Sequence, residues 1–111
     1  MPKTSRIYSN HTLQALKVFA SQIKLARKNH RWSEEELAER AGTSRSTLRR
    51  VEKGEPSAEI GLYFEIATLL GIPLFGEDSK SLRTVQKNLD MELALLPKRI
   101  DKESKEVFDE F

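Results

Sequence analysis

The sequence predicts a small all-α protein, and three observations support this fold class. Apolar residues recur at steps of three and four, the spacing that lines one face of a helix, whereas alternation typical of strands is almost absent. Serines stand where these periodic segments begin, and glycines stand where they stop. The 111 residues suffice for one small domain with extensions. We therefore expect several short helices around one core.

The first helix is expected over residues 12–29. Its inner face comprises Leu13, Leu16, Ala20, Ile23, Ala26 and Arg27. A second helix should start at Ser33, because Ser33 and Glu36 form an S-x-x-E capping box. In this motif, each side chain accepts a hydrogen bond from the backbone amide of the other residue. Gly42 suits the left-handed position that ends this helix. Its inner face holds Leu37, Ala38 and Ala41.

A third helix should begin after the capping residue Ser44 and end at Gly54. One side of it carries Leu48, Val51 and Glu52. The other side is basic and polar, with Arg45, Ser46, Arg49, Arg50 and Lys53. The basic side is expected to face outward.

A fourth helix is expected after Pro56, with Ser57 as its cap and Gly71 at its end. Its inward positions are Ile60, Tyr63 or Phe64, Ala67 and Leu70. A further amphipathic helix, ended by Pro97, carries an apolar face formed by Leu82, Val85, Leu89, Leu93 and Leu96. The predicted organisation is an arm over residues 1–10, a domain over 11–76, the amphipathic helix over 77–97 and a charged tail over 98–111.

Charge is divided unevenly between the halves of the chain. Residues 1–56 hold 12 Lys and Arg against 6 Asp and Glu, whereas residues 57–111 hold 7 against 11. The first half is the one that would attract a polyanion, although charged residues also form ordinary solvated faces. The absence of cysteine and the presence of only two histidines argue against a metal site. No apolar stretch is long enough for a signal peptide or a membrane span, so a cytoplasmic protein is expected.

The segment "LAERAGTSRSTLRRVEKG", followed by "IATLLGIPL", resembles the lambda repressor and Cro family of helix-turn-helix regulators, also called the XRE family. The resemblance covers residues 23–74. It depends on five positions occurring together, namely Ala38 where two helices cross, Gly42 in the turn, inward Leu48, Glu52 and Gly54. It implies a compact domain of four to five helices that binds DNA. Four helices packed together without a DNA role are the alternative.

In this family the helix after the turn enters the major groove. The resemblance therefore implies base contacts from Arg45, Ser46, Arg49 and Arg50, because arginine can hold guanine O6 and N7 and a serine hydroxyl suits either base type. Arg50 lies at the margin, where it could instead bind a phosphate or pair with an acid. Phosphate contacts are expected from helix N-termini and flanking side chains, here Ser33, Ser44 and Lys53.

One residue departs from the family pattern. Many members have glutamine directly after the position of Ser33 and donate from it to a phosphate, whereas this chain has Glu34. A carboxylate cannot make that donation, so Glu34 is interpreted as a favourable charge at the start of a helix.

Other residues are interpreted as structural. Arg27 and Glu52 match an ion pair that, in the family, ties the first helix to the third. Trp32 is expected in the core, and His11 and His30 at caps or on the surface.

The apolar face of the amphipathic helix could cover the protein's own core, but the preferred interpretation is a homodimer that binds a palindromic operator. The tail ends in "EVFDEF" and resembles the C-terminal ends of small XRE regulators that act as antitoxins of Hip-type kinase toxins. The function predicted is a DNA-binding transcriptional regulator, a repressor, with toxin neutralisation as the alternative. No phosphate-binding loop, cysteine nucleophile or paired histidine indicates an enzyme, and neither cofactor nor metal is expected.

Overall fold

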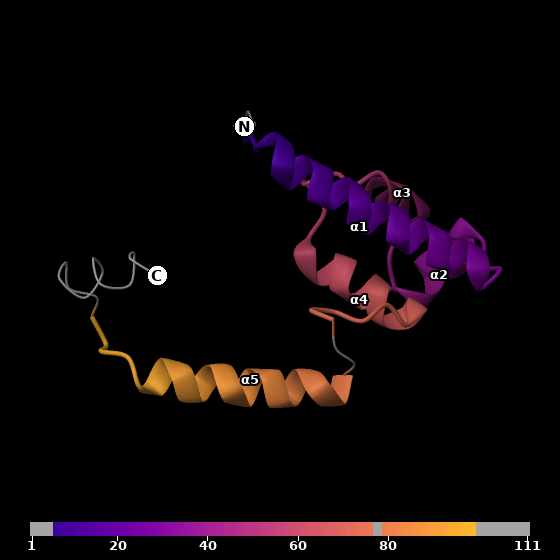
Figure 1. The fold of residues 1–111 in the computed structure, drawn as a ribbon. Helices are drawn as coiled ribbons and strands as arrows, with labels where there is room; N and C mark the ends of the chain where they lie inside the picture. Colours follow the sequence, from indigo (N-terminus) through magenta and orange to yellow (C-terminus); the bar gives the residue numbers. More distant parts are fainter. Residues whose placement is uncertain (1–5, 77–78, 100–111) are drawn as a thin grey trace. The chain divides into compact units, whose positions relative to one another are not determined.

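The computed structural model describes residues 6–76 and 79–99. The chain divides into two units, Met1–Gly76 and Glu77–Phe111. The first unit contains four helices, α1 (Asn10–Asn29), α2 (Glu34–Arg40), α3 (Arg45–Glu52) and α4 (Ile60–Leu70), and the second contains α5 (Ser79–Ala94) (Figure 1). The predicted all-α fold class is confirmed.

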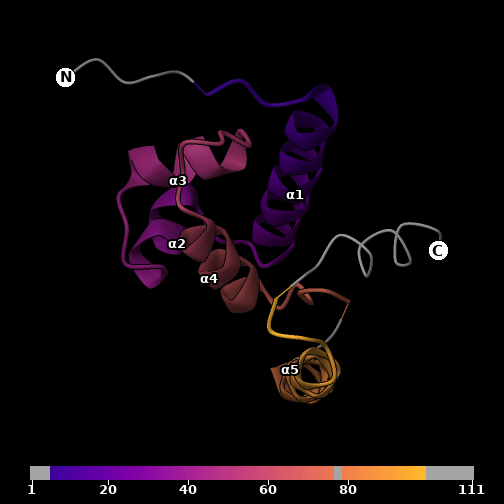
Figure 2. The ribbon, with the colours of Figure 1, turned by 90° about the vertical axis from the view of Figure 1, so that its left-hand side faces the viewer.

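A single core lies among the four helices of the first unit. Its buried members are Ile23, Leu37, Ala38, Leu48, Val51, Tyr63, Ile66 and Leu70. Helix α1 contacts both α3 and α4, and α2 contacts α3 (Figure 2). The long α1 therefore packs against α3 and α4, and α2 is held through its contact with α3.

Four helices of the first unit end in the same way. At the end of α2, the amide of Gly42 donates to the carbonyl of Glu39 and the amide of Thr43 donates to that of Ala38. This pattern, the Schellman motif, satisfies carbonyl groups that the helix leaves free. Gly42 has a φ of 67°, in the left-handed region where glycine is favoured. It therefore ends α2 where the sequence predicted.

Gly54 has a second reason to be glycine besides its φ of 75°. A Cβ placed there would lie 3.0 Å from the carbonyl carbon and oxygen of Leu16 on α1. The end of α3 therefore lies directly against the backbone of α1. Only glycine permits this approach without a shift of one helix.

The start of α4 differs from the prediction. Its N-cap is Glu59, which makes no side-chain capping hydrogen bond, and the predicted cap Ser57 lies two residues earlier. The Ser57 hydroxyl instead accepts a hydrogen bond from Arg50 at 3.2 Å. As a consequence, Ile60 opens the helix and is 68% exposed, so its assignment to the core was wrong. Ile66, which the sequence analysis did not assign, is fully buried.

The start of α1 and the end of α5 are also displaced by a few residues, whereas α1 ends at Asn29 as predicted. Helix α1 begins at Asn10, because the side chain of Ser9 accepts a hydrogen bond from the Thr12 amide. Helix α5 ends at Ala94, so Leu96 lies beyond the helix predicted to carry it. The predicted tail starts at residue 98, and its part from residue 100 onward lies outside the described residues.

Candidate nucleic-acid interface

Helix α3 has one buried side and one exposed side. Leu48 and Val51 are fully buried, because they fill the core between α1, α2 and α4. The opposite side exposes Arg45, Ser46, Arg49 and Arg50. The four residues predicted to contact bases therefore all lie on the exposed surface of α3. This surface can offer guanidinium and hydroxyl donors to a partner.

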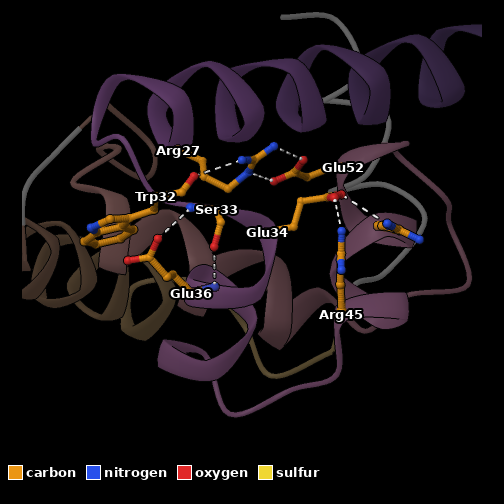
Figure 3. Close-up of polar contacts among 8 residues, drawn as sticks. Arg27, Trp32, Ser33, Glu34, Glu36, Arg45 and Glu52 are labelled. Carbon is orange, nitrogen blue, oxygen red and sulfur yellow. Dashed lines mark hydrogen bonds and ion pairs between the residues drawn. The ribbon is translucent and has the colours of Figure 1, made fainter.

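Ser33 and Ser44 occupy the N-caps of α2 and α3. Ser33 accepts from the Glu36 amide at 3.0 Å and Glu36 accepts from the Ser33 amide at 3.1 Å, so the predicted capping box is present (Figure 3). The Ser44 side chain accepts from the Thr47 amide at 3.1 Å. Both helices thus start at exposed serines, and their first-turn amides give these ends a partial positive charge.

Arg27 connects α1 to the end of α3 and to the loop before α2. Its Nε donates to Glu52 Oε2 at 2.7 Å, its Nη2 to Glu52 Oε1 at 3.1 Å, and its Nη1 to the carbonyl of Trp32 at 3.0 Å (Figure 3). The two side chains are 8% and 5% exposed, so the pair is nearly dry. The hydrogen bond to Glu52 raises the pKa of Arg27 above its usual value, despite the opposing effect of burial. The predicted ion pair is therefore present.

Glu34, in the first turn of α2, lies next to the outer surface of α3. Arg45 Nη2 is 3.5 Å from Glu34 Oε1, and Arg49 Nε is 3.4 Å from Glu34 Oε2 (Figure 3). Each carboxylate oxygen therefore faces one arginine. Desolvation acts to raise the pKa of Glu34, but the hydrogen bonds and charges of Arg49 and Arg45 outweigh it and lower that pKa. The sequence pattern indicated only an interaction of Glu34 with the helix dipole, and these contacts were not predicted.

Arg50 interacts with the loop between α3 and α4. Its Nε lies 3.7 Å from Glu55 Oε2, and its Nη2 donates to Ser57. Of the alternatives left open for Arg50, pairing with an acid is the one present in the structure. Its side chain remains 45% exposed.

A polar hollow of about 320 Å³ lies where α1, α2 and α3 meet. Its lining residues are Lys24, Glu34, Arg49, Glu52 and Lys53. Lys53 is a predicted phosphate contact, whereas Lys24 was not predicted to take part. The spacing could have indicated it, because Lys24 lies three residues before Arg27 and side chains at that separation are neighbours on a helix. Three cations from two helices thus share one hollow.

The family model described as helix-turn-helix matches residues 23–76, which include the end of α1 and all of α2, α3 and α4. Residues 23–76 are a lambda repressor-like helix-turn-helix domain. Curated proteins and solved structures give no match to the chain. The family is one of DNA-binding regulators.

Trp32 lies in the loop between α1 and α2, next to the ends of both helices. It packs against the core while remaining partly exposed, and its ring stacks on His30 with centroids 4.6 Å apart. The guanidinium of Arg40 lies over the same ring, 4.3 Å from its centroid. His30 caps α1, and its Nε2 lies 3.0 Å from the carbonyl oxygen of Leu70 at the end of α4. These contacts join the ends of α1, α2 and α4.

The described part of the chain contains no candidate metal site and no candidate membrane span. No group of three or more His, Cys, Asp or Glu that could hold a metal ion occurs there. No helix there has the length and apolar character that crossing a membrane requires. The features of the helix-turn-helix domain that remain to be explained are the cationic surface of α3 and the polar hollow beside it.

Proposed function

We propose that this protein is a sequence-specific repressor of transcription that binds a two-fold symmetric operator as a homodimer. The observation that carries the proposal is that α3 has a buried side and an exposed side. Leu48 and Val51 are buried in the core, and Arg45, Ser46 and Arg49 are exposed on the opposite side. In helix-turn-helix proteins this helix enters the major groove. Arginine at such positions discriminates guanine by a bidentate contact.

Phosphate contacts are assigned to the groups that flank α3. Ser33 and Ser44 begin helices, where amides attract an anion. Lys53 caps α3 and shares the polar hollow with Lys24. We add Lys24 to the predicted set, because it supplies a second lysine on the same side from a different helix. These contacts would hold the domain in register while α3 reads bases.

Helix α5 is assigned to dimerisation. Leu89 and Leu93 are 49% and 65% exposed, although both lie on the apolar face that also carries Leu82 and Val85. Leucines at steps of three and four suit the packing of one helix against another copy. A dimer would read two half-sites about one helical turn apart, about 34–36 Å.

The proposed function is tested by selecting duplexes from a random-sequence pool with the full-length protein, followed by footprinting on the promoter of its own gene. We expect a palindromic consensus, protection of a matching site in the promoter, and lower expression from that promoter when the protein is present. Recovery of no consensus, with equal binding to all duplexes, would contradict sequence-specific regulation. Protection of the site with increased expression would identify an activator instead.

A further inference from the structure

Glu34 is an acid among cations, and the other acid that lines the polar hollow, Glu52, is already paired with Arg27. Glu34 lines the polar hollow beside Lys24 and Lys53, and its two oxygens face Arg45 and Arg49 separately. Its side chain is 27% exposed, whereas those of Arg45 and Arg49 are 55% and 52% exposed. The acid is therefore the more enclosed partner, and the arginines keep most of their donor surface available.

We propose that Glu34 is a specificity-determining residue of the DNA interface, which supports Arg45 and Arg49 for base contacts and repels phosphates that would compete for them. The proposal rests on the DNA-binding function proposed above. Glu34 acts through the two arginines and through its charge, so it is a positioning residue and makes no base contact of its own.

The atoms used by each pair are compatible with a base contact. Arg49 faces Glu34 through Nε, which leaves both terminal amino groups free to donate to guanine O6 and N7. Arg45 faces Glu34 through one N–H of Nη2, which leaves the second N–H of Nη2 to donate together with a neighbouring nitrogen. An arginine can thus remain paired with Glu34 while it holds a guanine. Two anchored guanidinium groups would lose less side-chain freedom on binding than two free ones.

A phosphate contact is affected differently. A phosphate that enters the polar hollow to reach Arg49 would approach the carboxylate of Glu34, and the two anions would repel each other. Binding to random DNA depends almost entirely on phosphate contacts, whereas binding to an operator also includes base contacts. The charge of Glu34 should therefore weaken random binding more than operator binding.

The experiment compares Glu34→Gln, Glu34→Ala and Glu35→Gln with the unaltered full chain. Glu35 is the matched control, because it is the next residue in the same helical turn, is exposed, and loses the same charge. Fluorescence anisotropy measures Kd for a duplex selected by the unaltered protein and for a scrambled duplex of equal length. We expect Glu34→Gln to tighten binding to the scrambled duplex by roughly two- to fivefold and to change binding to the selected duplex less.

The deciding quantity is the Kd for the scrambled duplex divided by the Kd for the selected duplex. This ratio should fall in Glu34→Gln and fall further in Glu34→Ala, which retains no acceptor for either arginine. It should stay unchanged in Glu35→Gln. Equal ratios in all four proteins would overturn the proposal. Circular dichroism verifies that each variant folds, so that a fall in the ratio is measured only on folded protein.

A second measurement separates failure of this proposal from failure of the proposed function. In the DNA-free protein, the ¹⁵N–¹H signal of Arg49 Nε should shift in Glu34→Gln and stay in place in Glu35→Gln. An unchanged signal in Glu34→Gln would overturn the pairing, and with it this proposal, while leaving DNA binding intact. Absence of DNA binding by the unaltered protein would overturn the proposed function and this proposal together.

Discussion

Arg27 on α1 and Glu52 at the end of α3 are joined by two parallel hydrogen bonds of 2.7 and 3.1 Å. A third donation, from Arg27 to the carbonyl of Trp32, ties the same guanidinium to the loop before α2. One buried side chain therefore sets the relative positions of α1, α3 and the start of α2. Its loss should affect the domain as a whole.

Arg27→Met should lower the free energy of unfolding by about 3–5 kcal/mol, because Glu52 would remain as an uncompensated charge in a nearly dry place. Chemical denaturation measures the change. The double variant Arg27→Met with Glu52→Leu should recover part of the loss, since the stranded charge is gone. Lys24→Met, an exposed change on the same helix, serves as the control. Equal stability of Arg27→Met and the unaltered protein would mean that the pair does not form.

Tyr63→Phe should lower the free energy of unfolding by about 1–3 kcal/mol at neutral pH, because the carbonyl of Glu55 loses the hydroxyl donor 2.8 Å away. Burial, followed by the charge of Glu55, raises the pKa of Tyr63 in the folded protein. The phenol proton is therefore held in the folded state at a pH where the unfolded chain releases it. Its contribution is complete below about pH 10 and declines as the pH rises through the folded pKa.

Urea denaturation between neutral pH and pH 11 tests this dependence. The unaltered protein should lose stability more steeply above about pH 10 than Tyr63→Phe does. Tyr8→Phe, which alters the other tyrosine, should keep the steep loss. Parallel curves for all three proteins would exclude Tyr63 as the responsible group.

Gly54→Ala and Gly42→Ala provide a matched pair of backbone changes. Both glycines have positive φ, so alanine should cost about 1–2 kcal/mol at either site. Only at position 54 would the added Cβ also meet the backbone of Leu16, at 3.0 Å, whereas the space around Gly42 is open. Gly54→Ala should therefore be clearly more destabilising in denaturant titrations. Equal losses would show that α1 and α3 can move apart at little cost.

Arg45→Ala and Arg49→Ala should each weaken binding to a selected operator by about 1–3 kcal/mol and have much less effect on a scrambled duplex. Lys53→Ala should weaken both duplexes to a similar extent and reduce the slope of log K against log salt by roughly one. Anisotropy titrations at several salt concentrations measure both effects. Equal losses on the two duplexes would identify Arg45 and Arg49 as phosphate contacts.

Leu89→Glu should convert a dimer into a folded monomer with reduced operator affinity, if the apolar face of α5 forms the interface. Asn88→Glu adds the same charge at the neighbouring exposed position and should leave the dimer intact. Sedimentation velocity measures the mass, and circular dichroism measures folding. Unfolding of Leu89→Glu would instead mean that this face covers the protein's own core. A folded dimer would exclude both uses.

Helix starts and ends with local signals were the most predictable part of the fold. The Ser33 and Glu36 box and the turn at Gly42 act within a few residues, so the sequence pattern alone fixes them. Ser57 is not the cap predicted for α4, because the helix starts at Ile60 with Glu59 at its N-cap, and the Ser57 hydroxyl accepts a hydrogen bond from Arg50. A capping pattern does not reveal such a contact with another element.

The candidate site was predictable where periodicity determined exposure, as for Arg45 and Arg49. The contacts of these arginines with Glu34 depend on how α2 and α3 pack, across separations of 11 and 15 residues. Nothing in the local pattern around Glu34 indicates that packing. The Arg27 and Glu52 pair spans 25 residues and was anticipated only through the family resemblance.

The length of α3 limits how much information one copy can read. Its eight residues extend about 12 Å at about 1.5 Å per residue, whereas one base pair occupies about 3.4 Å of the duplex. One copy therefore faces about four base pairs, and a given sequence of four base pairs occurs by chance roughly once in 256 positions. A bacterial-sized genome offers more than about 10⁶ competing positions. The proposed dimer would add a second half-site at a fixed distance from the first, and the combined sequence would occur by chance far less often.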